Sequence, residues 1–180
     1  MSARSVTVRG LEIGGGSPVR VESMLKTPLD DRQGCSRELQ GLAQAGCELV
    51  RVAFPSPSNF EDLAALISDA EIPIMADIHF DPDLALLSLK AGAHAIRINP
   101  GNMGSPERLS QILETASERK AVVRIGANCG SLSGSQVAKA NGDRALALVG
   151  AVEEQLVFLK KSGFDNIILS AKSTSIRETV

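Results

Sequence analysis

The sequence has no tryptophan and no tyrosine, which leaves five phenylalanines as its only large aromatic rings. A surface that stacks nucleic-acid bases needs such rings beside positive charge, and the net charge of −2 also argues against this kind of surface. No apolar run approaches the roughly 20 residues of a membrane span. Residues 1–10 have neither the apolar core nor the cleavage site of a signal peptide. We therefore expect a cytoplasmic protein that binds neither nucleic acid nor a membrane.

Cysteine is scarce as well. Cys35, Cys47 and Cys129 are odd in number and far apart in the chain, so they indicate neither a disulfide framework nor a metal motif such as CxxC. We expect each to be a small buried or half-buried residue. The sequence predicts no metal site.

The 180 residues suit one domain with a sizeable core, and 43% hydrophobic and 22% charged residues are ordinary for a soluble globular protein. Apolar periodicity predicts strands that alternate with helices. The predicted strands are 19–24, 49–54, 74–78, 96–99, 122–128 and 166–172, and the predicted helices are 32–45, those starting near 58, 81 and 105, one covering 145–159, and one starting near 173.

Local signals refine these elements. Ser58 with Glu61 predicts a capping box, and Asp81 and Ser105, each followed by proline, predict N-caps. Residues 130–142 are predicted to be a polar loop. Residues 5–8 and 11–13 predict a short hairpin that covers one end of the domain.

Strands and helices that alternate at roughly 20 to 45 residues per unit indicate a parallel α/β protein, either a barrel or a doubly wound sheet. Polar residues at nearly every strand's C-terminal end favour the barrel. A closed eightfold barrel needs about 250 residues, and only six units can be counted. The predicted fold is therefore an α/β, TIM-like (β/α) barrel that is truncated after about six βα units and preceded by a β-hairpin.

Two segments of the chain look like copies of one βα unit. Residues 45–52 and 91–98 align with a glycine after each helix and an arginine at the same offset in each strand, Arg51 and Arg97. A third strand carries Arg124. Arginine inside a barrel is costly unless an anion or a carboxylate meets it. Three arginines on the inward side of parallel strands would form a cationic pocket.

The remaining strand ends add polar residues that period-two alternation turns toward the same side. His79 could donate to a phosphate, take part in proton transfer, or simply bond to Asp77. Asp77 could accept a substrate hydroxyl or anchor an arginine. Guanidinium forks match phosphate oxygens, so we expect a ligand with several of them. The predicted substrate-binding residues are Arg51, Asp77, His79, Arg97, Asn99, Arg124, Asn128 and Lys172.

Five motifs resemble one known family. They are VESM at 21–24, ADIHF at 76–80, RINPGN at 97–102, RIGANCGSL at 124–132 and SAKS at 170–173. The chain is similar to the N-terminal TIM barrel of 4-hydroxy-3-methylbut-2-enyl diphosphate synthases, which act in the non-mevalonate isoprenoid pathway. The resemblance covers nearly the whole chain.

The resemblance implies an oxidoreductase that reductively converts 2-C-methyl-D-erythritol 2,4-cyclodiphosphate. Arg51, Arg97, Arg124 and Lys172 would hold the diphosphate, with His79 and Asn128 beside them, and Asp77 and Asn99 would line the same pocket. The family carries a 4Fe-4S cluster in a C-terminal domain, takes electrons from flavodoxin or ferredoxin, and forms a homodimer at full length. The family's CPxC-type cluster motif is absent here. We therefore expect residues 1–180 to be a partial substrate-binding barrel that is inactive alone.

Two alternatives remain open. One is a transferase barrel of the dihydropteroate synthase type, which binds a pterin and diphosphate in a similar mouth. The other is a non-catalytic, anion-binding half-barrel.

Overall fold

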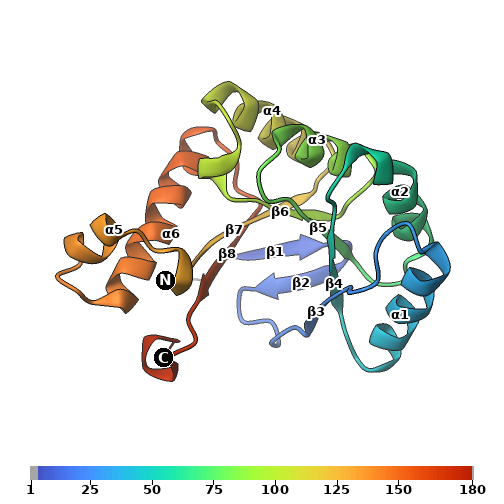
Figure 1. The fold of residues 1–180 in the computed structure, drawn as a ribbon, viewed down its shortest axis with the longest axis horizontal. Helices are drawn as coiled ribbons and strands as arrows, with labels where there is room; N and C mark the ends of the chain where they lie inside the picture. Colours follow the sequence, from blue (N-terminus) through green and yellow to red (C-terminus); the bar gives the residue numbers. More distant parts are fainter. Residues whose placement is uncertain (1–3, 180) are drawn as a thin grey trace.

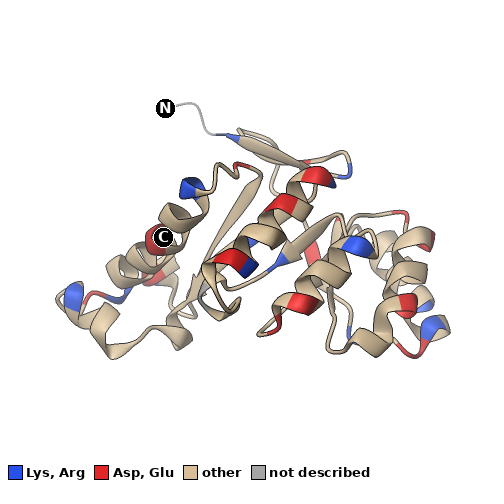
Figure 2. Cartoon of the chain, turned by 90° about the horizontal axis from the view of Figure 1, so that it is seen from above, with Lys and Arg blue, Asp and Glu red and all other residues tan. Residues whose placement is uncertain are grey.

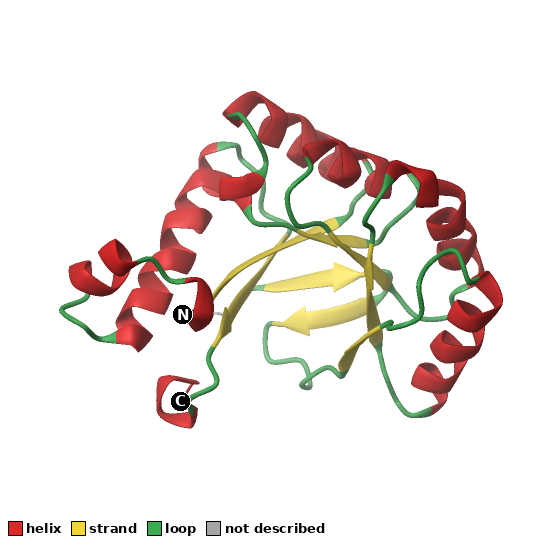
Figure 3. Ribbon diagram, in the orientation of Figure 1, coloured by secondary structure: helices red, strands yellow, loops and turns green. Residues whose placement is uncertain are grey.

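The computed structural model describes residues 4–179 and shows a curled sheet of six parallel strands with a separate antiparallel hairpin (Figure 1). The hairpin lies inside the curve of the sheet (Figure 3). The predicted α/β barrel architecture is therefore confirmed as a half-barrel. The strands are β1 (Ser5–Val8), β2 (Leu11–Gly14), β3 (Glu22–Met24), β4 (Leu49–Ala53), β5 (Ile74–Asp77), β6 (Ala95–Arg97), β7 (Val122–Asn128) and β8 (Ile167–Lys172).

Helices cover the outer face of the sheet, as the red ribbons around the yellow strands in Figure 3 show. None of the helices described is long and apolar enough to span a bilayer. The helices are α1 (Arg32–Gln44), α2 (Phe60–Asp69), α3 (Pro82–Lys90), α4 (Pro106–Glu118), α5 (Gly134–Lys139), α6 (Arg144–Lys161) and α7 (Ile176–Thr179), with short 3-10 turns η1 (Pro57–Asn59), η2 (Pro100–Asn102) and η3 (Cys129–Ser131).

The six parallel strands pair in the order in which they occur in the chain, from β3 to β8. Asp77 of β5 lies opposite Arg97 of β6, and Arg97 lies opposite Arg124 of β7. Each strand pairs with the next after one helical crossover, as expected for repeated βα units. This register places the polar ends of neighbouring strands at one level.

The two faces of each strand bury different apolar layers. Residues on the outer face, such as Val50, Ile74, Ile96 and Val123, belong to the main core under the helices. Residues on the inner face form a smaller cluster with the hairpin: Leu49, Met75, Ala95 and Val122 from the sheet, and Val8 from β1. The hairpin thus plugs the N-terminal end of the barrel, which agrees with the predicted cover.

Two predicted helix caps are confirmed and one is wrong. Asp81 accepts a hydrogen bond from Asp83 N at 2.8 Å, and Ser105 accepts one from Arg108 N at 3.4 Å. The predicted capping box at Ser58 and Glu61 does not form. Ser56 instead caps η1, and α2 begins only at Phe60, because Pro57 starts a short 3-10 turn first.

Three element predictions are corrected. The first barrel strand begins at Glu22 rather than 19, because Val19 is 96% exposed and packs on nothing. The polar loop predicted at 130–142 contains α5, which Ser133 and Gln136 cap reciprocally. The buried stripe of α6 matches the predicted 145, 149, 152, 156, 159 pattern only at Val152 and Leu159, because the helix is turned so that Val149 is 49% exposed. It consists of Ala147, Leu148, Ala151, Val152 and Leu159.

Gly126 of β7 is required by the close approach of β8. A Cβ atom at this position would lie 2.1 Å from the Ser170 carbonyl oxygen and 2.6 Å from Ser170 Cβ. Gly126→Ala should therefore force β8 away and lower the free energy of unfolding by about 1 to 3 kcal/mol, as other overpacked sites do. Urea unfolding measures this, with Gly150→Ala as the control, because nothing lies within 4 Å of a Cβ there. Equal destabilisation of the two variants would contradict the assignment.

Candidate functional site

A charged layer lies directly above the apolar plug, at the C-terminal ends of the parallel strands, which we call the mouth. Each member follows an inward apolar residue by two positions: Arg51 follows Leu49, Asp77 follows Met75, Arg97 follows Ala95 and Arg124 follows Val122. Because side chains alternate along a strand, all of these charged residues point to the inside of the barrel. Alternation thus explains why the polar residues gather.

Asp77 joins two arginines. Its Oδ1 accepts a hydrogen bond from Arg97 Nη1 at 2.9 Å, and its Oδ2 lies 3.2 Å from Arg51 Nε. The Asp77 side chain is only 3% exposed, whereas those of Arg51 and Arg97 are 24% and 34% exposed. Of the two roles that the sequence left open for Asp77, the contacts show that it anchors arginines.

Glu22 joins a second pair. Its carboxylate accepts hydrogen bonds from Arg124 Nη1 at 2.6 and 2.7 Å, and Arg51 Nη1 lies 3.3 Å from its Oε1. Arg124 also donates to Ser170 Oγ at 3.1 Å. The strands β3 and β7 are not neighbours in the sheet, so this contact crosses the mouth. It forms because the sheet curls.

The mouth is therefore less cationic than the sequence predicts. Three guanidinium groups share two carboxylates, which leaves an excess of one positive charge among these five side chains. Elsewhere the acidic and basic residues are scattered over the helices (Figure 2). One donor of the network remains unused, because Arg124 Nε is buried and makes no hydrogen bond with the described residues, whereas Arg51 Nε lies against Asp77 Oδ2 at 3.2 Å.

The other predicted site residues lie around this network rather than in it. His79 is 60% exposed, with its Nε2 3.9 Å from Asp77 Oδ2. Asn128 is exposed and caps η3 by accepting a hydrogen bond from Gly130 N at 3.0 Å. Lys172 is exposed and pairs with Asn128 in the strand register. Asn99 is exposed and lines a groove of about 410 Å³ near α6.

The prediction of site residues omitted Glu22 and Ser170. Both stand at strand ends, but the two-residue alternation does not show which arginine each will meet. The contact from Glu22 to Arg124 spans 102 positions of the chain, and only the curvature of the sheet brings them together. The signal available in the sequence was the position of Glu22 on the same inward side as Met24.

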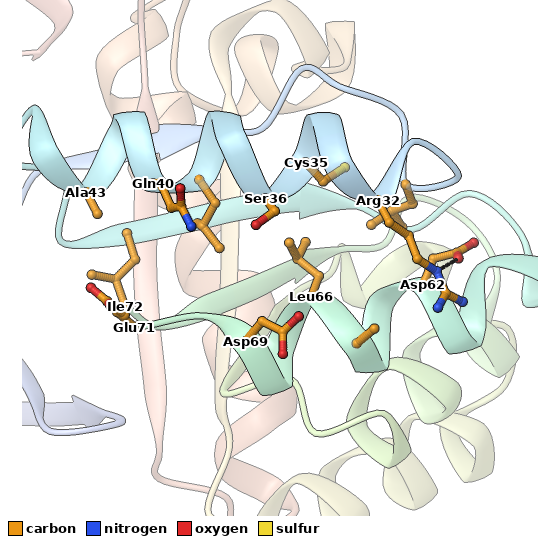
Figure 4. A pocket seen from close by; sticks show the side chains of 13 residues that line it. Arg32, Cys35, Ser36, Gln40, Ala43, Asp62, Leu66, Asp69, Glu71 and Ile72 are labelled. Carbon is orange, nitrogen blue, oxygen red and sulfur yellow. Dashed lines mark hydrogen bonds and ion pairs between the residues drawn. The ribbon is translucent and has the colours of Figure 1, made fainter.

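A second cavity, of about 190 Å³, lies between α1 and α2 on the outside of the barrel (Figure 4). Arg32 and Asp62 form an ion pair of 2.6 Å at one end of it. Cys35 also lines it, but burial, together with Asp31 and other nearby carboxylates, raises the pKa of this thiol. A raised pKa keeps a thiol protonated and poorly nucleophilic. This cavity is therefore a weaker candidate for chemistry than the mouth.

The cysteines are buried as predicted, at 1% exposure for Cys35 and 6% for Cys47 and Cys129. Cys129 donates to Glu178 Oε2 at 3.2 Å, and the other two donate to backbone carbonyl groups. Within residues 4–179, no three His, Cys, Asp or Glu side chains are grouped so that they could hold a metal ion.

Comparison with known proteins agrees with this architecture. The family model described as the GcpE TIM-barrel domain matches residues 3–180. Relatives named 4-hydroxy-3-methylbut-2-en-1-yl diphosphate synthase (flavodoxin) are 38% identical over 177 residues in Maridesulfovibrio salexigens and in Aquifex aeolicus. These alignments cover 98% of this chain, and 49% and 50% of the relatives. The chain thus spans about half the length of the curated relatives it matches.

Solved structures share the fold at much lower identity. Dihydropteroate synthase from Vibrio fischeri superposes with a TM-score of 0.64 and 16% identity, and covers 93% of this chain and 66% of its own. The enzyme from Yersinia pestis gives a TM-score of 0.60 and 19% identity, and the superposition covers 92% of this chain and 61% of the enzyme. Likeness at this level concerns the barrel alone, whereas the family match concerns the sequence along nearly its whole length. The chain therefore belongs to the GcpE TIM-barrel family.

Proposed function

We propose that this chain forms the substrate-binding barrel of a 4-hydroxy-3-methylbut-2-en-1-yl diphosphate synthase and binds the diphosphate of 2-C-methyl-D-erythritol 2,4-cyclodiphosphate in the mouth. Arg51, Arg97 and Arg124 hold the phosphate oxygens. Lys172, His79 and Asn128 approach from the rim, and Asp77 and Asn99 line the same space.

The observation that carries this proposal is the buried Nε donor of Arg124, which has no hydrogen-bond partner among the described residues although two other arginines lie beside it in the mouth. Buried polar groups in proteins nearly always have partners, so a donor without one indicates an acceptor that binds there. Guanidinium groups match phosphate oxygens in geometry and stay charged at any working pH. A diphosphate supplies several such acceptors at once, which suits three arginines on neighbouring strands.

Asp77 and Glu22 have different parts in this binding. Asp77 is buried and fixes the guanidinium groups of Arg51 and Arg97 before the ligand arrives, so less side-chain freedom is lost on binding. Glu22 has a side chain that is 26% exposed and occupies the donors of Arg124 that a phosphate would use. Diphosphate therefore competes with Glu22 for Arg124.

A 4Fe-4S cluster supplies the electrons for the reductive step in this family. The residues described here do not fit such a cluster, because the three cysteines are separated and buried, and residues 4–179 contain no metal-ligating group. We therefore assign the cluster to the part of the relatives that this chain does not match. No step of the reduction is derived from the barrel.

The relatives' name includes flavodoxin, so we propose flavodoxin as the electron donor, and a homodimer in the cytoplasm as the working form. The half-barrel would be one substrate-binding domain of that assembly. The dihydropteroate synthase alternative is less well supported, because its likeness is one of fold at 16–19% identity.

Calorimetric titration of the chain tests the proposal. The cyclic diphosphate should bind at one site per chain, and a pterin diphosphate should bind much more weakly. Tighter binding of the pterin diphosphate would favour the transferase alternative. Absence of binding by both compounds would contradict a diphosphate site in the mouth.

Glu22→Gln should tighten binding of the cyclic diphosphate about tenfold, because it removes a negative charge that competes with the ligand for Arg124. In the wild type this competition lowers the binding free energy by about 1.5 kcal/mol, the value of one charge-assisted hydrogen bond. The same titration measures this. Glu12→Gln is the matched control, since Glu12 lies in the hairpin strand β2, away from the mouth. Weaker binding by Glu22→Gln would show that Glu22 orients the arginines instead of competing for them.

A further inference from the structure

A pocket of about 810 Å³ lies at the opposite end of the barrel from the mouth, beside the hairpin. Its cations come from separate elements: Arg9 from the hairpin turn, and Arg119 and Lys120 from the junction between α4 and β7. His94, Ser5 and Thr7 add polar groups, and among residues 4–179 no aspartate or glutamate lines the pocket. In a chain with a net charge of −2, this is a local concentration of positive charge.

Two of these cations occupy strained backbone positions. Arg9 and Lys120 have φ values of 46° and 54°, and Asn141 is the only other non-glycine residue among those described with a positive φ. At the equivalent junctions after α1, α3 and α6 the chain has glycine: Gly46, Gly92 and Gly163. A side chain in this region of backbone space is unfavourable, so a lysine here indicates a use for its ammonium group.

Structural contacts account for only part of this charge. Arg9 Nη1 donates to the carbonyl oxygen of Ala70 at 2.6 Å and so caps the end of α2. Arg119 and Lys120 make no side-chain hydrogen bond or ion pair with the described residues. Their charged head groups are therefore free to contact a ligand. Capping of α2 gives a structural reason for the charge of Arg9, but not for the charges of Arg119 and Lys120.

His94 adds a directed donor. Its Nδ1 accepts a hydrogen bond from Ile74 N at 3.1 Å, so the neutral ring carries its proton on Nε2. Nε2 has no partner among the described residues. Burial, and then the charge of Arg9, lower the pKa of His94, which keeps the ring neutral. An anion beside it would reverse the second of these effects.

We propose that this pocket binds the phosphate or diphosphate group of a small molecule, held by Arg9, Arg119, Lys120 and the Nε2–H of His94. Val6, which is partly exposed, also lines the pocket and would contact an organic group attached to the phosphate. The site is separate from the mouth and does not depend on the function proposed for it. Occupancy here would link the hairpin to the α4–β7 junction.

The two histidines of the chain make the test specific, because His79 lies at the mouth and His94 at this pocket. We would titrate the chain with inorganic diphosphate and with butyl diphosphate and follow both imidazole rings by NMR. Each ligand should shift the His94 signals in a saturable way and raise the pKa of His94. Tighter binding of butyl diphosphate identifies an organic phosphate as the ligand, and equal binding identifies the free inorganic anion.

Variants separate the site from general electrostatics. Arg119→Gln and Lys120→Gly should each raise the ligand concentration that half-saturates the His94 shift about tenfold. A change of this size corresponds to the loss of one charge-assisted contact. Lys120→Gly should also raise the melting temperature, because glycine relieves the backbone, so misfolding cannot explain its loss of binding. Arg37→Gln on exposed α1 and Asn141→Gly, with the same backbone relief elsewhere, are the matched controls.

A His79 response without a His94 response would overturn the proposal and leave the function of the mouth intact. A His94 response that is unchanged in Arg119→Gln and Lys120→Gly would overturn it as well. A His94 response without one at His79 would support this site and count against the diphosphate site in the mouth.

Discussion

Replacing Asp77 by alanine should lower the free energy of unfolding by about 3 kcal/mol, the cost of breaking a buried charge pair by removal of one partner. The carboxylate is 3% exposed and lies between Arg97 Nη1 at 2.9 Å and Arg51 Nε at 3.2 Å. Without it, Arg97 loses its carboxylate partner and Arg51 keeps only the contact with Glu22 at 3.3 Å. The loss lies in the lower part of the usual range because both arginine side chains keep some contact with water.

Urea unfolding of Asp77→Ala gives this value directly. Asp83→Ala is the matched control, since Asp83 is 59% exposed and pairs with Arg108 at 2.6 Å on the surface. An exposed pair of this kind contributes about 0 to 1 kcal/mol. Added diphosphate should restore part of the stability of Asp77→Ala, because the anion replaces the missing charge. Similar losses in the two variants would show that Asp77 does not organise the mouth.

Arg97→Ala should weaken binding of the cyclic diphosphate by about 10- to 150-fold, which corresponds to about 1.5 to 3 kcal/mol for a charge-assisted contact. Arg97→Lys should lie between this variant and the wild type. Lysine keeps the positive charge and loses the planar fork that pairs with two phosphate oxygens. Asp77 keeps Arg51 as a partner in both variants, so the fold should tolerate the change.

Calorimetry of the purified variants measures the affinities, and thermal unfolding confirms that they are folded. Arg108→Ala is the matched control, because Arg108 is an exposed arginine in an ion pair outside the mouth. Wild-type affinity in Arg97→Ala would assign Arg97 a structural role only.

The part of the site that depends on local sequence could be predicted. Period-two alternation in β4, β6 and β7 is enough to turn Arg51, Arg97 and Arg124 inward, whatever the curvature of the sheet. The N-caps at Asp81 and Ser105 are also local and formed as expected. These features depend on residues within a few positions of one another.

The predictions that were wrong or incomplete concern contacts between residues that lie far apart in the chain. The sequence gives no means of deciding that Glu22 neutralises Arg124, because the two strands are separated by three others in the sheet. The apolar stripe of α6 was predicted correctly at Val152 and Leu159 but not at Val149, because helical periodicity defines faces but not how far the helix is turned toward the sheet. The missed helix α5 is different, since Ser133 and Gln136 have the spacing of a capping box and could have revealed it.

The chain-order pairing of the strands has a consequence for how the half-barrel folds. Each new strand docks beside the one completed just before it, so most of the sheet can grow by closing short loops at low entropic cost. The hydrogen bond from Glu22 to Arg124 is different, because it closes a loop of 102 residues and requires every intervening strand to be curved already. It is therefore a late event on the folding pathway, and its strength acts on the rate at which the native half-barrel opens more than on the rate at which it forms.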